Sequence, residues 1–141
     1  MKYLRIAILL ASVIAATAAC AKSPKAELTN FKYRLHQEAP GRVVHLSMAG
    51  TIINKTANNL TASVCVRWYD AKGVEIHRNF SDEVKLKPRQ SDSVTYTGYQ
   101  RAEDWARTVL LKAFVSHPVF CDSPGEAISP VVELKVKNTT Q

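Results

Sequence analysis

The sequence predicts an all-β domain, an antiparallel β-sandwich of seven to eight short strands. Apolar residues recur at every second position through most of the chain after residue 27, as in strands buried on one face. Turn-forming residues separate these runs at intervals of about 8 to 12 residues. No segment has the alternation of strand and helix that a parallel sheet requires. A β-barrel is the main alternative architecture.

Two strands are expected in the first part of the domain. The first runs from Glu27 to His36, where apolar and polar residues alternate. The second is longer and runs from Arg42 to Asn54. We expect a bend or a bulge at Gly50, because glycine inside a strand often marks one. A turn follows over residues 54–59.

The clearest strand of the chain extends from Leu60 to Tyr69, where even-numbered apolar residues form one face. The next four residues, Asp70 to Gly73, have the composition of a tight turn, since Asp accepts backbone hydrogen bonds and Gly adopts positive φ. Val74 to Phe80 is therefore expected to return as the second arm of a hairpin.

The second half contains four more strands and one helical segment. We expect a short strand at Val84 to Lys87, which Pro88 closes, and another at Ser91 to Thr97. Residues 99–106 (YQRAEDWA) are the only segment with helical character, of about two turns. The last expected strands run from Arg107 to His117 and from Val131 to Val136, with a loop at 122–127 between them.

The first 19 residues have the organisation of a secretory signal peptide. Lys2 and Arg5 give a positive start, an uncharged run of 11 residues covers 6–16, and small residues precede a cleavage site after Ala19. A bilayer span takes about 20 apolar residues, so this run is too short for a permanent membrane helix.

Residues 17–20 (TAAC) resemble the lipobox of bacterial lipoproteins, in which the cysteine becomes the lipidated first residue of the mature chain. The resemblance implies an acyl anchor, including palmitate, on Cys20. Asp after the cysteine commonly retains lipoproteins at the inner membrane, so Ala21 implies an outer-membrane lipoprotein that faces the periplasm. The alternative is ordinary cleavage after Ala18 or Ala19, which would give a secreted or soluble periplasmic protein.

The chain therefore divides into a signal peptide (1–19), a lipidated cysteine with its tether (20–26), a sandwich domain (27–137) and a polar tail (138–141). The tether would span about 20 Å when fully extended. With 46% apolar and 22% charged residues, the composition excludes collagen-like, low-complexity and wholly disordered chains. The full chain has a net charge of +7, and loss of Lys2 and Arg5 with the signal would leave +5.

Two cysteines remain besides Cys20. Cys65 and Cys121 are expected to form a disulfide, because thiols of a small exported domain usually pair in an oxidising compartment. The closed loop would stabilise the fold by roughly 4 kcal/mol. Cys65 lies on the odd-numbered face of its strand, which we expect to be the outer face, and the bond would hold the segment after Pro118 across it. The alternative is two unrelated free thiols.

Residues 50–56 (GTIINKT) and 60–73 (LTASVCVRWYDAKG) resemble the core of FxLYD-type domains, which read G-x-(apolar)-x-N before a strand that ends in (aromatic)-Tyr-Asp-x-x-Gly. In a small lipoprotein, this form is especially similar to the YcfL-like family of Gram-negative periplasmic lipoproteins. The resemblance extends over about residues 41–116. It implies an immunoglobulin-like sandwich, and it brings no catalytic residues and no established activity.

The sequence contains none of the common catalytic, phosphate-loop, dinucleotide or zinc-protease motifs. We therefore predict a non-enzymatic protein without catalytic residues, metal ligands or cofactors. Glu75 and His77 share a strand face, where a cross-strand salt bridge is the expected arrangement and an acid–base pair the alternative. Histidine and methionine are copper ligands, and the chain contains His36, His45, His77, His117 and Met48. We expect scattered surface histidines, and a copper site is the weaker alternative.

Lys85, Lys87 and Arg89 alternate and form a candidate basic contact stripe, to which Arg34, Arg42 and Arg67 would add if their strands are neighbours. Behind an outer-membrane anchor, the polyanions within reach are peptidoglycan and lipid phosphates, and no nucleic acid partner is expected. Four Asn-x-Ser/Thr sequons, at Asn54, Asn59, Asn79 and Asn138, permit glycosylation in a eukaryotic secretory pathway, although these residue types also gather in β-turns.

These expectations together predict an envelope lipoprotein, a membrane-tethered interaction module whose partner is another envelope protein. Exposed strand edges would offer that partner a place for β-addition. The alternative is a periplasmic inhibitor or immunity protein that blocks an exported enzyme or toxin. Its contact loop would lie near Cys121, at residues 116–126.

Overall fold

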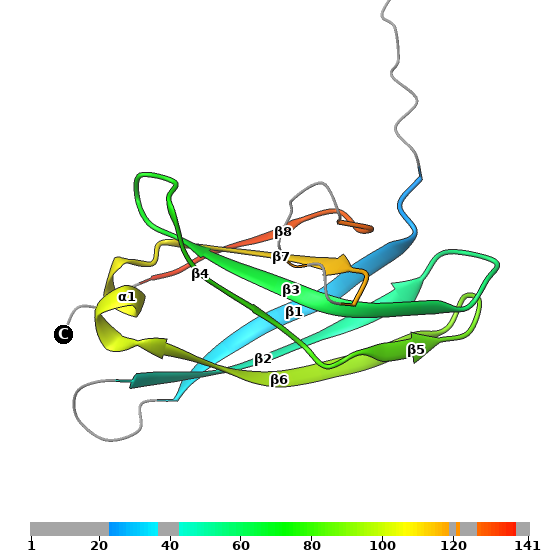
Figure 1. The fold of residues 1–141 in the computed structure, drawn as a ribbon, viewed down its shortest axis with the longest axis horizontal. Coiled ribbons are helices and arrows are strands. Elements are labelled where there is room, and N and C mark those ends of the chain that lie inside the picture. The colour runs from blue at the N-terminus through cyan, green and yellow to red at the C-terminus, as the bar shows by residue number, and fades with distance from the viewer. Residues whose placement is uncertain (1–22, 37–42, 119–120, 122–126, 138–141) are drawn as a thin grey trace, which may run out of the picture.

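The computed structural model describes residues 23–36, 43–118, 121 and 127–137, and it confirms the predicted antiparallel β-sandwich (Figure 1). This part of the chain forms eight strands and one short helix. They are β1 (Ala26–His36), β2 (Val43–Asn54), β3 (Leu60–Tyr69), β4 (Glu75–Phe80), β5 (Val84–Leu86), β6 (Ser91–Arg101), α1 (Ala102–Arg107), β7 (Leu110–Ser116) and β8 (Val132–Lys135).

The strands form two separate sheets, so the architecture is a sandwich and not a closed barrel. One sheet has the order β1-β2-β6, and the other has the order β4-β3-β7-β8. Strand β5 pairs with the beginning of β3, beyond the end of β4. All these pairs are antiparallel. In Figure 1 the two sheets lie one above the other, with α1 at the end opposite to the entry of the N-terminal segment.

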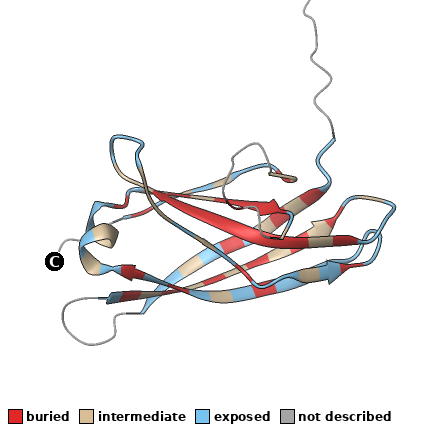
Figure 2. Cartoon of the chain, in the orientation of Figure 1, coloured by how far each residue is buried: buried red, intermediate tan, exposed pale blue. Residues whose placement is uncertain are grey.

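The core lies between the sheets and follows the period-2 pattern of the sequence. Along β2 the even-numbered residues are buried and the odd-numbered ones are partly exposed. Strand β3 differs, because seven consecutive residues from Ala62 to Trp68 are buried, which places buried side chains on both of its faces (Figure 2). The largest fully buried side chains of the core are Trp68, Leu46, Met48, Ile52, Leu86 and Leu111.

The hairpin predicted at Asp70–Gly73 is confirmed. The Asp70 carboxylate accepts hydrogen bonds from the backbone N–H groups of Lys72 (2.8 Å) and Val74 (2.9 Å). Gly73 has φ of +77°, a conformation that residues with a side chain rarely adopt. Turn chemistry that was visible in the sequence therefore determines how β3 connects to β4.

The bulge expected at Gly50 lies instead in the neighbouring strand. Thr29 pairs with Thr51 and Lys32 with Ala49, so two residues of β1 lie opposite Gly50. One of them, Asn30, has φ of +52°, which Asn tolerates better than most residues. Gly50 itself is required for close packing, because a Cβ atom there would lie 3.0 Å from Leu28 Cδ1 and 3.2 Å from Phe31 Cδ2.

The helix also differs from its predicted position at 99–106. Strand β6 continues through Tyr99, Gln100 and Arg101, which pair with β2, and α1 begins only at Ala102. Gln100 is buried. Pairing with a distant strand therefore overrides the local helical preference of these three residues.

Asn54, the first residue of a sequon, stabilises the β2–β3 turn. Its side-chain carbonyl accepts hydrogen bonds from Thr56 N (2.9 Å) and Thr56 Oγ1 (2.8 Å). Its amide group donates to the carbonyls of Asn58 (2.8 Å) and Lys87 (3.0 Å). Since Asn54 is fully buried, this sequon is a turn motif in the folded chain.

We expect Gly50→Val to lower the free energy of unfolding by about 1–3 kcal/mol, because the new side chain must displace Leu28 and Phe31. Urea denaturation measures the change. The matched control is Ala49→Val, the adjacent residue on the outer face of β2, which should change stability by no more than about 0.5 kcal/mol. Equal effects of the two variants would contradict the close packing at Gly50.

Asn54→Ala should destabilise the domain by about 1–3 kcal/mol, because it removes the turn acceptor and leaves the backbone carbonyls of Asn58 and Lys87 without this donor. Asn59→Ala is the control, since Asn59 is exposed at the end of the same turn. Thermal unfolding followed by circular dichroism compares the two. A lower melting temperature for Asn59→Ala than for Asn54→Ala would show that the turn depends on different contacts.

Candidate functional site

The structure joins Cys65 and Cys121 in the predicted disulfide, with their Cα atoms 5.5 Å apart. As expected, Cys65 lies on the face of β3 that points away from the core. That face is not exposed, however. Cys65, Cys121 and Phe114 form a second buried cluster, with Ala127 packed against it. The disulfide therefore holds Cys121 over the outer face of β3 and shields that face from solvent.

Arg67, two residues along the same face, is the main polar group of this cluster. Its side chain is only 4% exposed and forms an ion pair with Glu75 of the neighbouring strand β4, with 3.5 Å between the guanidinium nitrogen and the carboxylate oxygen. A second guanidinium nitrogen donates a hydrogen bond to the carbonyl of Cys121. The guanidinium also lies over the Phe114 ring, 5.5 Å from its centroid. Arg67 is thus held between β4, β7 and the disulfide.

These contacts change two expectations. Arg67 does not belong to a surface stripe, because β3 and Cys121 bury it. Glu75 forms the expected cross-strand ion pair with Arg67 and a second one with Arg78, at 2.5 Å. His77 instead packs against the Trp68 ring, 5.1 Å between centroids. The expectation that Glu75 and His77 share a strand face is wrong. An irregularity in β4 places His77 opposite Trp68 and Glu75 opposite Tyr69, and these two neighbours point to opposite faces of β3.

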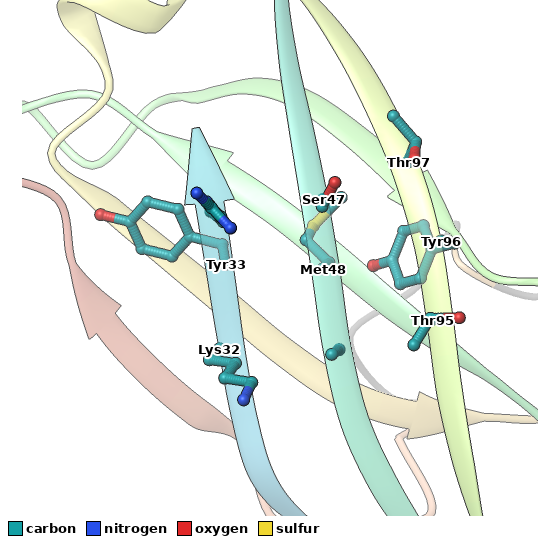
Figure 3. A pocket seen from close by; sticks show the side chains of 9 residues that line it. Lys32, Tyr33, Ser47, Met48, Thr95, Tyr96 and Thr97 are labelled. Atoms are coloured by element: carbon teal, nitrogen blue, oxygen red, sulfur yellow. The ribbon is translucent and has the colours of Figure 1, made fainter. Parts of the chain in front are cut away.

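A surface hollow of about 690 Å³ lies on the β1-β2-β6 sheet (Figure 3). Three successive residues from each strand line it, and they pair in register across the sheet. The middle row, Tyr33, Met48 and Tyr96, belongs to the core or packs against it. Since side chains alternate along a strand, the rows on either side point outward. The hollow is therefore on the outer face of this sheet.

The centre of the hollow is formed by small side chains of β2, Ser47 and Ala49. Strand β1 contributes Lys32 and Arg34 on one side, and β6 contributes two threonines, Thr95 and Thr97, on the other. The lining residues include two cations and no carboxylate. This arrangement offers hydrogen-bond donors to a polar or anionic surface, with no paired acid and base for catalysis.

One row further along the same face, His36 lies opposite His45, and His45 contacts the Tyr99 ring at 4.3 Å in an edge-on geometry. His45 points outward and Met48 lies in the core, as their three-residue spacing predicts. The described part of the chain contains no group of three His, Cys, Asp or Glu residues placed to hold a metal ion. The His45–Tyr99 pair therefore lies beside the hollow and not in it.

Lys85, on β5, and Lys87, directly after it, are exposed on either side of the buried Leu86, at the edge of the second sheet. They line a shallow groove of about 310 Å³ together with the start of β3. Arg89 lies in the following turn with φ of +60° and donates to the carbonyl of Lys55. Arg34 lies on the other sheet, so it does not join Lys85 and Lys87.

The remaining predicted positions are Ala19, Cys20, Arg42 and Asn138, which lie outside the described residues, as does most of the predicted contact loop at 116–126. Strand β1 begins at Ala26, the last residue of the expected tether. Within the part of the chain that the structure describes, no helix is long and apolar enough to cross a membrane.

Comparisons with known proteins identify the class of fold. No protein-family model matches the chain, and no curated protein matches it. A β-glucuronidase of glycoside hydrolase family 2 is similar with a TM-score of 0.52 and 13% identity, over 74% of this chain. β-Glucuronidase 2 of Bacteroides uniformis gives a TM-score of 0.52 and 9% identity, over 78% of this chain.

The match covers only 11% and 13% of those two glycosidases, so it shows a shared β-sandwich fold and transfers no activity. Such a domain is compatible with a non-enzymatic module. Another similar structure is a DUF1425 family member from Shewanella sp. pv-4, at 20% identity and a TM-score of 0.41. Here the match covers 68% of this chain and 81% of that one.

We expect replacement of both disulfide cysteines, Cys65→Ala with Cys121→Ala, to lower the free energy of unfolding by about 2–4 kcal/mol. Denaturation of the oxidised and reduced wild-type protein provides a second measure, and reduction should have a similar effect. Cys20→Ala is the control and should leave the unfolding curve unchanged, since Cys20 takes no part in this bond. An unchanged midpoint after loss of the disulfide would contradict its role in covering β3.

Proposed function

We propose that this chain is a non-enzymatic envelope lipoprotein, a β-sandwich interaction module tethered through Cys20 to the periplasmic side of the outer membrane. Its binding surface is the outer face of the β1-β2-β6 sheet, and its partner is another envelope protein. The lipobox-like residues before Cys20 support the anchor. The resemblance of residues 50–73 to FxLYD-type domains and to YcfL-like lipoproteins supports the class of protein.

The hollow is the observation on which the choice of binding surface depends. Ser47 and Ala49 are small, so a partner can approach the sheet closely at its centre. Lys32 and Arg34 take part in no ion pair among the described residues and are therefore available to acidic groups of a partner. Thr95 and Thr97 add hydroxyl groups along the other side. Polar surfaces of this kind suit reversible contacts between folded proteins.

Intact mass of the protein purified from membranes tests the anchor. We expect a chain that begins at Cys20 and carries acyl groups, with Cys65 and Cys121 unreactive toward alkylation until they are reduced. Cys20→Ser should abolish the acyl mass without changing the disulfide. An unmodified soluble chain would overturn the lipoprotein assignment, and added sugar masses would indicate a secreted glycoprotein instead.

Site-specific photo-crosslinking in cells tests the binding surface. A crosslinker at Thr97, exposed beside the hollow, should capture a defined envelope protein. The control position is Glu133, exposed on β8 of the other sheet, which should not capture that protein. Equal capture from both positions, or capture from Glu133 alone, would overturn the assignment of this face. A captured exported enzyme that the chain inhibits would instead favour the inhibitor or immunity function.

A further inference from the structure

Five lysine and arginine residues lie at the end of the sandwich where β1 begins. We name this surface the basic end, and it consists of Lys25, Lys55, Lys85, Lys87 and Arg89. In Figure 1 strand β1 begins at this end, where β2 also ends, while α1 lies at the opposite end. The fold therefore places these positive charges at the end of the domain to which the expected tether is attached.

Hydrogen bonds to backbone groups link four of these residues. Lys55 N donates to the carbonyl of Lys25, at 2.9 Å, and the Arg89 guanidinium donates to the carbonyl of Lys55. The buried Asn54 side chain donates to the carbonyl of Lys87, at 3.0 Å. Four of the five cations thus lie within one hydrogen bond of the Asn54–Lys55 peptide. Lys55 lies in the β2–β3 turn, Lys87 and Arg89 lie in the β5–β6 turn, and Lys25 lies in the expected tether.

Neutralisation at this end is incomplete. Lys55 forms an ion pair with Glu27, at 3.2 Å. Lys85, Lys87 and Arg89 form no ion pair within the described part of the chain, although Glu83 and Asp92 lie nearby in sequence. No carboxylate of the described residues therefore neutralises these three positive charges, which can interact with anions in front of the domain.

At the opposite end, two of the cations are paired. Arg101 forms an ion pair with Glu103, at 3.5 Å, and Arg107 forms one with Asp104, at 2.6 Å. Lys72 and Lys135 are exposed at this end and form no ion pair among the described residues. What distinguishes the basic end is therefore its place beside the expected tether.

We propose that the basic end docks on anionic lipid headgroups of the bilayer that holds the anchor, so that the domain stands on this end. The proposal rests on the lipoprotein function proposed above. A tether from Cys20 to Ala26 reaches about 20 Å at most. It therefore keeps the basic end close to a membrane surface, where each lysine or arginine contributes about 1 kcal/mol of attraction to anionic lipid.

Lysine-reactive footprinting of the anchored protein tests this orientation. The protein, purified from membranes with its anchor, is reconstituted into nanodiscs of phosphatidylcholine alone or of phosphatidylcholine mixed with phosphatidylglycerol. We expect Lys55, Lys85 and Lys87 to be labelled about fivefold or more slowly in the anionic discs, a factor that corresponds to the attraction of a single lysine. Lys72 and Lys135, exposed at the opposite end, are internal controls and should be labelled equally in both.

A charge variant separates lipid contact from a simple change of reagent concentration near an anionic surface. Lys85→Gln with Lys87→Gln should restore the labelling rate of Lys55 in anionic discs toward its value in neutral discs. The matched control, Lys72→Gln with Lys135→Gln, should retain the protection. Added salt should remove the protection, because these charges are exposed and screened. Equal labelling of Lys55 in the two disc types would overturn the docking.

The outcomes also distinguish this proposal from the proposed function. A protein that carries the acyl anchor but shows no lipid-dependent protection would overturn the docking alone. A protein without acyl groups would overturn the lipoprotein function, and with it the orientation. Protection that arises only when purified peptidoglycan sacculi are added to neutral discs would overturn the lipid proposal and assign the basic end to the cell wall.

Discussion

Burial of β3 on both faces is the constraint on which the rest of the sandwich depends. Its even-numbered face, with Trp68 fully buried, packs in the core, and its edges pair with β4, β5 and β7. A sheet of a two-layer sandwich normally meets water on its other face. Here that face carries Cys65 and Arg67, both buried. It therefore needs a cover, and the bond between Cys65 and Cys121 supplies one from a distant part of the chain.

The cover also explains how the fold accommodates a buried guanidinium. Burial of an unpaired charge costs several kcal/mol, and an ion pair offsets that cost only when further hydrogen bonds complete it. Glu75 provides the opposite charge, and the Cys121 carbonyl provides an acceptor on the other side. The Nε atom of Arg67 still has no partner among the described residues. The hydrogen bonding of the Arg67 guanidinium therefore depends on the Cys65–Cys121 disulfide, because the disulfide holds the Cys121 carbonyl in place.

The sequence predicts most of the fold because strand faces depend on local alternation. Leu60–Tyr69 is predicted with the observed bounds, since turn residues lie on both sides of a strong period-2 pattern. Tyr99–Arg101 is mispredicted because its pairing with β2 involves residues more than fifty positions away. At Gly50 the glycine marks an irregularity of the sheet, but only the register reveals that the extra residue belongs to β1.

The candidate surfaces are less predictable for the same reason. Alternation alone places Thr95 and Thr97 on one face of their strand. Their position beside Lys32 and Arg34, however, requires the order β1-β2-β6, in which β6 is distant from β2 along the chain. The exposed Lys85 and Lys87 are visible as an alternating pair. Their neighbours Lys25 and Lys55 become apparent only through hydrogen bonds across the end of the sandwich.

The proposed tether would change the consequences of weak contacts at both surfaces. A few exposed lysines give a free protein only modest attraction to a membrane, and salt screens much of it. An anchor converts this contact into an intramolecular event with a high effective concentration, so a modest attraction is enough to orient the domain. With the basic end on the bilayer, the hollow on the β1-β2-β6 face lies along the side of the domain and not beneath it. Membrane attachment and partner binding would then use different surfaces of one small sandwich, so neither would exclude the other.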